Sequence, residues 1–183
     1  MIRELSVWWF KRSGWRFMGT LPKHHSKVIL LLGPISKKSD LFLWLAIIEL
    51  TRYKVRLAID KRKIHLISKL WQRPFRVLPL DLEWKKRTRI EIINKINERN
   101  KSCIAFMLND WNDIENWEDH FSMEVAAKTE SKVVLVAFDH YRKVVKFHTD
   151  FIPSGNKERD QSYVKSFFSN FYSYLLSDKV DQR

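Results

Sequence analysis

The sequence predicts a single α/β domain in which a mixed, mostly parallel sheet is flanked by helices. Short apolar runs of strand length alternate along the chain with longer segments of helical periodicity. The first run, residues 28–32, is unbroken and rich in branched side chains, as in a strand buried on both faces. It leads through Gly33 and Pro34 into an apolar helix at residues 39–50. A strand, a tight turn and a buried helix in this order indicate a parallel sheet.

Composition limits the size of the fold and the class of partner. The chain has 183 residues, enough for one domain with a substantial core, and a formal net charge of +13. We therefore expect an anionic partner: nucleic acid, a phospholipid surface or a phosphorylated ligand. Eight tryptophans and twelve phenylalanines favour the lipid surface, because aromatic rings beside basic residues suit the membrane interface. The lone Cys103 fits a reducing compartment, and no apolar run reaches the roughly 20 residues of a transmembrane helix.

Residues 2–17 predict an amphipathic helix with a break near Ser13 and Gly14. It can be an interfacial anchor, with tryptophans at headgroup level and cations against lipid phosphates. It can equally be a helix that packs on the core and turns its charges to solvent. The residues expected to contact the membrane in the first case are Trp8, Trp9, Lys11, Arg12, Trp15 and Arg16.

The remaining elements follow from alternation and periodicity. Strands are expected at residues 54–59, 75–80, 102–108 and 132–138, with 144–148 as the antiparallel partner of the last. Helices are expected at residues 64–73, 82–101, 115–129 and 158–177, and Ile90, Ile92, Ile93 and Ile96 are expected to face the core. The chain is thus divided into a membrane-interface helix (residues 1–18), an α/β domain (19–177) and a flexible tail (178–183).

Seven short blocks resemble, in order and spacing, those of the lysophospholipid or 1-acyl-glycerol-3-phosphate acyltransferase (PlsC-like) family over roughly residues 7–172. The blocks are GWRFMG at 14–19, PISKKSD at 34–40, IDK at 59–61, LPLDL at 78–82, LNDWN at 108–112, VAFDH at 136–140 and FIPSG at 151–155. The resemblance implies a glycerolphosphate-acyltransferase-like fold. It also implies substrate-binding positions at Ser36, Lys37, Lys38, Lys61, Asn109, Asp110 and Asn112.

The catalytic chemistry of that family is missing from this chain. In the family a histidine acts as general base and an aspartate orients it, because the histidine pKa lies near neutrality. Here Ile35 stands at the histidine position, with Asp40 at that of the aspartate. Asp110 and Asn112 replace the glycine and arginine that would grip glycerol phosphate, and Asp110 would repel a phosphate. His120 is the remaining base that can lie near the pocket.

The sequence therefore predicts a catalytically degenerate acyltransferase-fold protein that binds a lipid or a protein partner at the cytoplasmic face of the membrane. The alternative is an active acyltransferase of altered mechanism, which would take an acyl chain from an acyl carrier protein or coenzyme A thioester and use His120 as base. Nucleic-acid binding is a minor alternative, because charge alone supports it. We expect no metal ion or other cofactor, and as partners an anionic phospholipid surface and an additional protein.

Overall fold

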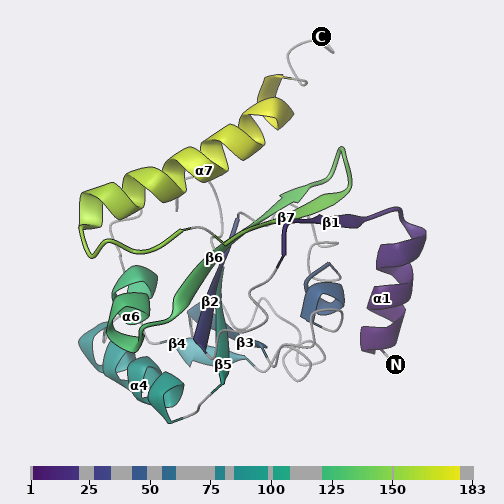
Figure 1. Cartoon of the computed structure of the whole chain (residues 1–183). Helices are drawn as coiled ribbons and strands as arrows, with labels where there is room; N and C mark the ends of the chain where they lie inside the picture. Colours follow the sequence, from purple (N-terminus) through teal and green to yellow (C-terminus); the bar gives the residue numbers. More distant parts are fainter. Residues whose placement is uncertain are drawn as a thin grey trace.

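The computed structural model describes residues 2–20, 27–33, 43–48, 55–60, 77–80, 85–98, 101–107, 121–149 and 151–177 (Figure 1). Within these residues one sheet has the strand order β1-β7-β6-β2-β5-β3-β4. The strands are β1 (Arg16–Met18), β2 (Lys27–Leu32), β3 (Val55–Asp60), β4 (Leu78–Leu80), β5 (Ser102–Met107), β6 (Lys132–Asp139) and β7 (Val144–His148). The helices are α1 (Ile2–Arg12), α4 (Lys85–Asn97), α6 (Phe121–Thr129) and α7 (Lys157–Ser177), and residues 43–48 are also helical.

The predicted α/β fold with a mostly parallel sheet is confirmed. Strands β6, β2, β5, β3 and β4 are parallel to one another, while β7 is antiparallel to β6 and β1 is parallel to β7. The central strands are apolar along their length because both faces of the sheet are covered. In β2, for example, Val28 and Leu30 belong to one core cluster and Ile29 and Leu31 to the other.

The two core clusters correspond to two layers of helix. Residues 43–48 and Phe10 of α1 pack on one face of the sheet. Helices α4, α6 and α7 cover the opposite face through side chains such as Ile92, Val125 and Phe168. Figure 1 shows α1 on one side of the sheet and α4, α6 and α7 on the other.

The first helix is shorter than the sequence predicted. It ends at Arg12, and residues 16–18 form strand β1 instead of a helical continuation. Gly14 has a φ of 76°, the left-handed conformation that ends helices. The N–H of Trp15 then donates to the carbonyl oxygen of Phe10 (3.2 Å) and that of Gly14 to Lys11 (3.3 Å), the hydrogen-bond pair of a Schellman motif. At Gly14, where the sequence predicted only a break within the helix, the helix therefore ends.

Helix α4 corrects one predicted core residue. Ile92 and Ile96 are buried, as expected, and Ile93 packs partly against the same cluster. Ile90 is exposed. Since successive residues of a helix are about 100° apart, Ile90 lies roughly opposite Ile92 and cannot share its face. The predicted helix at residues 64–73 and the tail at 178–183 lie outside the described residues.

Candidate functional site

The carboxyl ends of three neighbouring parallel strands, β2, β5 and β3, lie at one edge of the sheet. Leu32 of β2 pairs with Met107 of β5, and Phe106 pairs in turn with Ala58 of β3. Gly33 extends β2 by one step, because its N–H donates to the carbonyl oxygen of Val136 (2.8 Å). The register therefore aligns the ends of these strands side by side.

Each predicted substrate-binding segment starts from this edge. Residues 34–40 follow β2, Lys61 follows β3, and residues 108–112 follow β5. The side chains themselves lie outside the described residues and their roles stay predictions: Ile35, Ser36, Lys37, Lys38, Asp40, Lys61, Asn109, Asp110, Asn112 and His120. The described strands show that these three segments, although distant in sequence, begin at the adjacent ends of β2, β5 and β3.

The chain leaves β2 and β5 toward opposite faces of the sheet. After β2 it passes through residues 43–48 on the face of Val28 and Leu30, on its way to β3. After β5 it passes through α6 on the face of Ile29 and Leu31, on its way to β6. In the strand order β6-β2-β5-β3 these two connections also run in opposite directions. Such a reversal between adjacent parallel strands is where open α/β sheets form a ligand crevice, so the β2–β5 edge is our candidate site.

Trp44, which the sequence suggested only as part of an apolar helix, contributes an unsatisfied donor. It is fully buried on the helical segment that follows β2, and its ring meets Phe138 near the end of β6 edge-on, with centroids 5.7 Å apart. Its Nε1 is buried and has no hydrogen-bond partner within the part of the chain that the structure describes. An unsatisfied buried donor costs about 1–3 kcal/mol, and such groups are expected where a water or ligand oxygen supplies the acceptor. No sequence pattern could have signalled this, because it depends on tertiary packing.

Two of the blocks that resemble the acyltransferase family, residues 136–140 and 151–155, form local hydrogen bonds that shape a hairpin and the start of a helix. In the block at 136–140, Asp139 Oδ1 accepts the N–H of Arg142 (2.7 Å) and so closes the β6–β7 hairpin. In the block at 151–155, the N–H groups of Ser154 and Gly155 donate to the buried carboxylate of Asp160 (2.9 and 3.2 Å). Asp160 thereby fixes the chain at the start of α7.

A cavity of about 390 Å³ opens at the opposite edge of the sheet, where β6 begins. Its lining residues are Ala126, Ala127, Glu130, Ser131, Lys132, Phe151, Ile152 and Pro153. None of these residues was predicted as part of a site. The cavity lies at the beginning of β6, whereas the β2–β5 candidate site lies at the carboxyl ends of the strands.

Some of the residues predicted to contact a membrane are exposed, and others pack against the core. Trp8 is 57% exposed, with the Arg12 guanidinium 5.7 Å from its ring centroid, and Lys11 and Arg16 are exposed. Trp9, in contrast, packs partly against the core.

Trp15 was predicted to contact the membrane, and the structure corrects this prediction. It is only 9% exposed, because its ring packs between Phe10 (centroids 6.5 Å apart) and His140 (5.4 Å, edge-on). As the residue after Gly14 in the Schellman motif, it makes the hydrophobic contact back to the helix that accompanies this cap. Trp15 therefore fastens α1 to the sheet in this structure and is not available at the surface.

Cys103 lies inside β5, and burial raises the pKa of its thiol well above the ordinary value. The thiolate is therefore strongly disfavoured, and Cys103 is a buried cysteine unsuited to act as a nucleophile. Among the described residues, no group of three or more His, Cys, Asp or Glu side chains is placed to hold a metal ion.

None of the described helices is both long and apolar enough to cross a membrane. No protein-family model matches this chain, and no curated protein matches its sequence. Function must therefore be inferred from the residues of this chain.

Proposed function

We propose that this protein is a catalytically degenerate acyltransferase-fold protein that binds lipid, or a protein partner, at the cytoplasmic face of the membrane. The observation that carries the proposal is the outer face of α1, where Leu5 and Trp8 are exposed beside Lys11 and Arg12. Aromatic and aliphatic side chains that face solvent next to cations are typical of helices that lie in the headgroup region of a bilayer.

The expected strength of this contact is that of a reversible, peripheral protein. Each cation near an anionic surface contributes about 1 kcal/mol. Partial burial of Trp8 and Leu5 adds about 2–3 kcal/mol. With Lys11, Arg12 and Arg16, the total corresponds to a dissociation constant on the order of 0.1 mM in accessible lipid. Because the cationic part is screened over roughly 8–10 Å, binding weakens as salt rises.

A lipid is the ligand that we propose for the β2–β5 edge. Trp44 lies in the segment that follows β2, and none of the described residues supplies an acceptor for its indole N–H. An ester or carboxyl oxygen of a lipid would satisfy that donor, and an acyl chain would match the apolar residues around it. Catalysis is not part of the proposal, because Ile35 cannot accept a proton.

The test is sedimentation with vesicles of phosphatidylcholine alone or with 30% phosphatidylglycerol, at low and high salt. We expect binding only to the anionic vesicles, and loss of binding in high salt. Trp8→Ser and Lys11→Glu should each weaken it several-fold. Lys157→Glu removes an exposed cation from the start of α7 and serves as the charge control, which should bind nearly as wild type. Equal binding of wild type to both vesicle types would contradict the proposal.

A further inference from the structure

The tip of the β6–β7 hairpin, residues 140–143, lies beside the end of α1. The N–H of Arg16 in β1 donates to the carbonyl oxygen of Lys143 (2.9 Å), and Arg16 pairs with Val144 in the ladder. A Cβ at Gly14 would be 3.8 Å from Cδ of Lys143. Figure 1 shows the hairpin extending past β1 toward the carboxyl end of α1. Segments about 130 residues apart in sequence thus share one surface.

Aromatic contacts hold the β6–β7 hairpin rigidly against α1. The ring of Phe17 in β1 stacks on Phe10 of α1 (centroids 4.8 Å apart) and contacts Phe147 of β7 (5.4 Å). Trp15 also joins α1 to His140 in the hairpin. Whatever binds the outer face of α1 therefore meets the hairpin in a fixed orientation.

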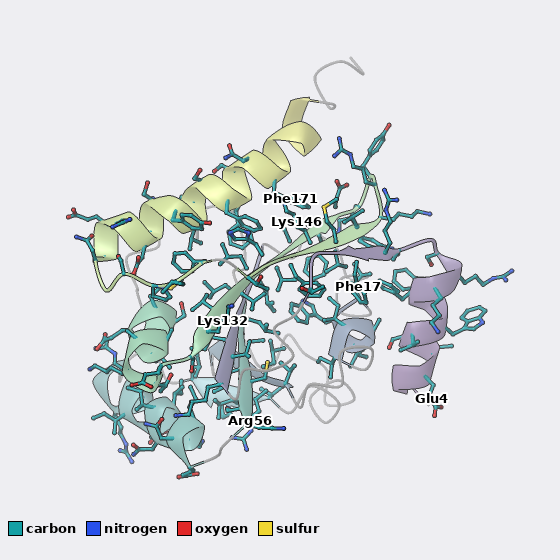
Figure 2. All side chains as sticks on the ribbon, in the orientation of Figure 1. Glu4, Phe17, Arg56, Lys132, Lys146 and Phe171 are labelled. Carbon is teal, nitrogen blue, oxygen red and sulfur yellow. The ribbon has the colours of Figure 1, made fainter. Side chains whose placement is uncertain are left out.

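The tip of the hairpin carries one exposed aromatic ring and two exposed cationic side chains. Tyr141 is 76% exposed, and Arg142 and Lys143 are exposed beside it. The adjoining surface adds Lys11, Arg12 and Arg16. Residues 8–20 contain no carboxylate, and Glu4 lies at the far end of α1 (Figure 2).

The acidic and basic residues nearest in sequence are otherwise engaged. Asp139 is buried; its carboxylate accepts the N–H of Arg142 inside the hairpin and lies 4.0 Å from Nε of the Arg142 guanidinium. Lys146 belongs to the other face of β7, where its ammonium is 5.7 Å from the ring centroids of both Phe167 and Phe171 on α7 (Figure 2). The one acid of the hairpin, Asp139, is thus paired with Arg142, while Tyr141 and Lys143 are exposed beside this pair.

Lys143 holds its position at a conformational cost. Its φ is 52°, in the left-handed region, which costs a residue with a Cβ about 1–2 kcal/mol relative to glycine. A left-handed residue is common in hairpin turns, so the turn fixes the backbone of Lys143 and leaves its side chain exposed at the tip.

We infer that the β6–β7 hairpin tip is a second membrane-contact element that acts together with α1. Tyr141 lies at headgroup level, where an amphipathic ring is favoured, and Arg142 and Lys143 bind phosphates of anionic phospholipids. Two contacts joined by a rigid sheet edge fix the orientation of the domain on the bilayer, which one helix cannot do. This inference rests on the proposed membrane function and assigns it further residues.

Two pairs of variants test the inference by partitioning into vesicles that contain 30% phosphatidylglycerol. Lys143→Gly removes the cation and relieves the backbone, so we expect unchanged or higher thermal stability with about fivefold weaker partitioning, as for one cation at an anionic surface. Its matched control is Glu130→Gly: Glu130 also has a positive φ (53°) but lies at the start of β6, away from the hairpin, so partitioning should not weaken. Tyr141→Ser should weaken partitioning several-fold, whereas Ile152→Ser, at a side chain 80% exposed on the opposite edge, should not.

The possible outcomes distinguish a membrane contact by the hairpin from membrane binding by α1 alone. Partitioning that falls with Trp8→Ser but is unchanged by Lys143→Gly and Tyr141→Ser would refute the hairpin contact and leave α1 as the anchor. Wild-type protein that ignores anionic vesicles would remove both. Hairpin-dependent binding to a 20-base-pair DNA duplex without vesicle binding would show that the surface serves nucleic acid, and would also overturn the inference.

Discussion

Gly19 lies directly against the backbone of Phe147, so that a Cβ at this position would meet the Phe147 carbonyl oxygen. Its φ of 83° is also in the left-handed region. Together with Gly14, it brackets strand β1, so the two glycines of the GWRFMG block shape the edge of the sheet.

We therefore expect Gly19→Ala to destabilise the protein by about 2–5 kcal/mol, since an unfavourable φ and a backbone overlap act together. Gly155→Ala is the matched control. Gly155 has a similar φ of 78°, but nothing lies within 4 Å of an added Cβ. That variant should lose only about 1–2 kcal/mol. Urea unfolding of both proteins measures the difference, and equal losses would mean that the contact with Phe147 is not what requires glycine.

The helices α4 and α6 are joined by an ion pair with a defined pH dependence. Glu124 on α6 accepts from Arg89 of α4 (2.7 Å) and from Lys128 (2.8 Å). The hydrogen bond from Lys128, with the charges of Arg89 and Lys128, lowers the pKa of Glu124 despite partial burial. Because the folded-state pKa is depressed, the stabilisation is present above the unfolded-state pKa and is lost as the pH falls through the folded-state value.

Glu124→Gln should consequently cost about 0.5–1 kcal/mol at pH 7 and nothing once the pH is below the folded-state pKa of Glu124. Urea unfolding at neutral and acidic pH measures this change. Glu91→Gln supplies the comparison, since Glu91 pairs with Arg87 (3.4 Å) between largely exposed side chains and should have no measurable effect. A cost for Glu124→Gln that does not depend on pH would point to packing instead of charge.

Most of the fold could be predicted because the central strands are apolar on both faces. The run at 28–32 and the segment at 132–138 carry that signal without ambiguity, and β2 and β6 occupy these positions. Residues 16–17 were predicted wrongly as helix because the mixture of aromatic and basic side chains continues unchanged past Gly14. The pairing of β1 with β7, which decides between helix and strand, involves residues far away in sequence.

The candidate site could be predicted only as a set of loops. Sequence order places residues 34–40 before Lys61 and residues 108–112, but it does not state that β5 lies between β2 and β3. That insertion brings the three segments to one edge and creates the reversal between β2 and β5. The unsatisfied Trp44 N–H and the strained Lys143 were also beyond prediction, because burial and backbone angle are properties of the folded chain.

Restoring a base at the β2–β5 edge should not by itself restore catalysis. Ile35→His would return an imidazole to the position that a general base occupies in the acyltransferase family, and Asp40 remains in the chain to orient it. We expect no acyl transfer to lysophosphatidic acid from acyl carrier protein or coenzyme A thioesters, measured as released thiol. Under the proposal, Asp110 and Asn112 stand where the acyltransferase family has the glycine and arginine that hold phosphate, and residues of one catalytic unit do not act independently.

The triple variant that adds Asp110→Gly and Asn112→Arg to Ile35→His is the matched comparison. It restores the base and the phosphate contact together, so turnover by the triple variant alone would support a degenerate acyltransferase site. Turnover by the wild-type protein would contradict the proposal, and its loss in His120→Ala would identify His120 as the base. A general base contributes about 10²–10⁴ in rate, so removal of a working one is large enough to detect by thiol release.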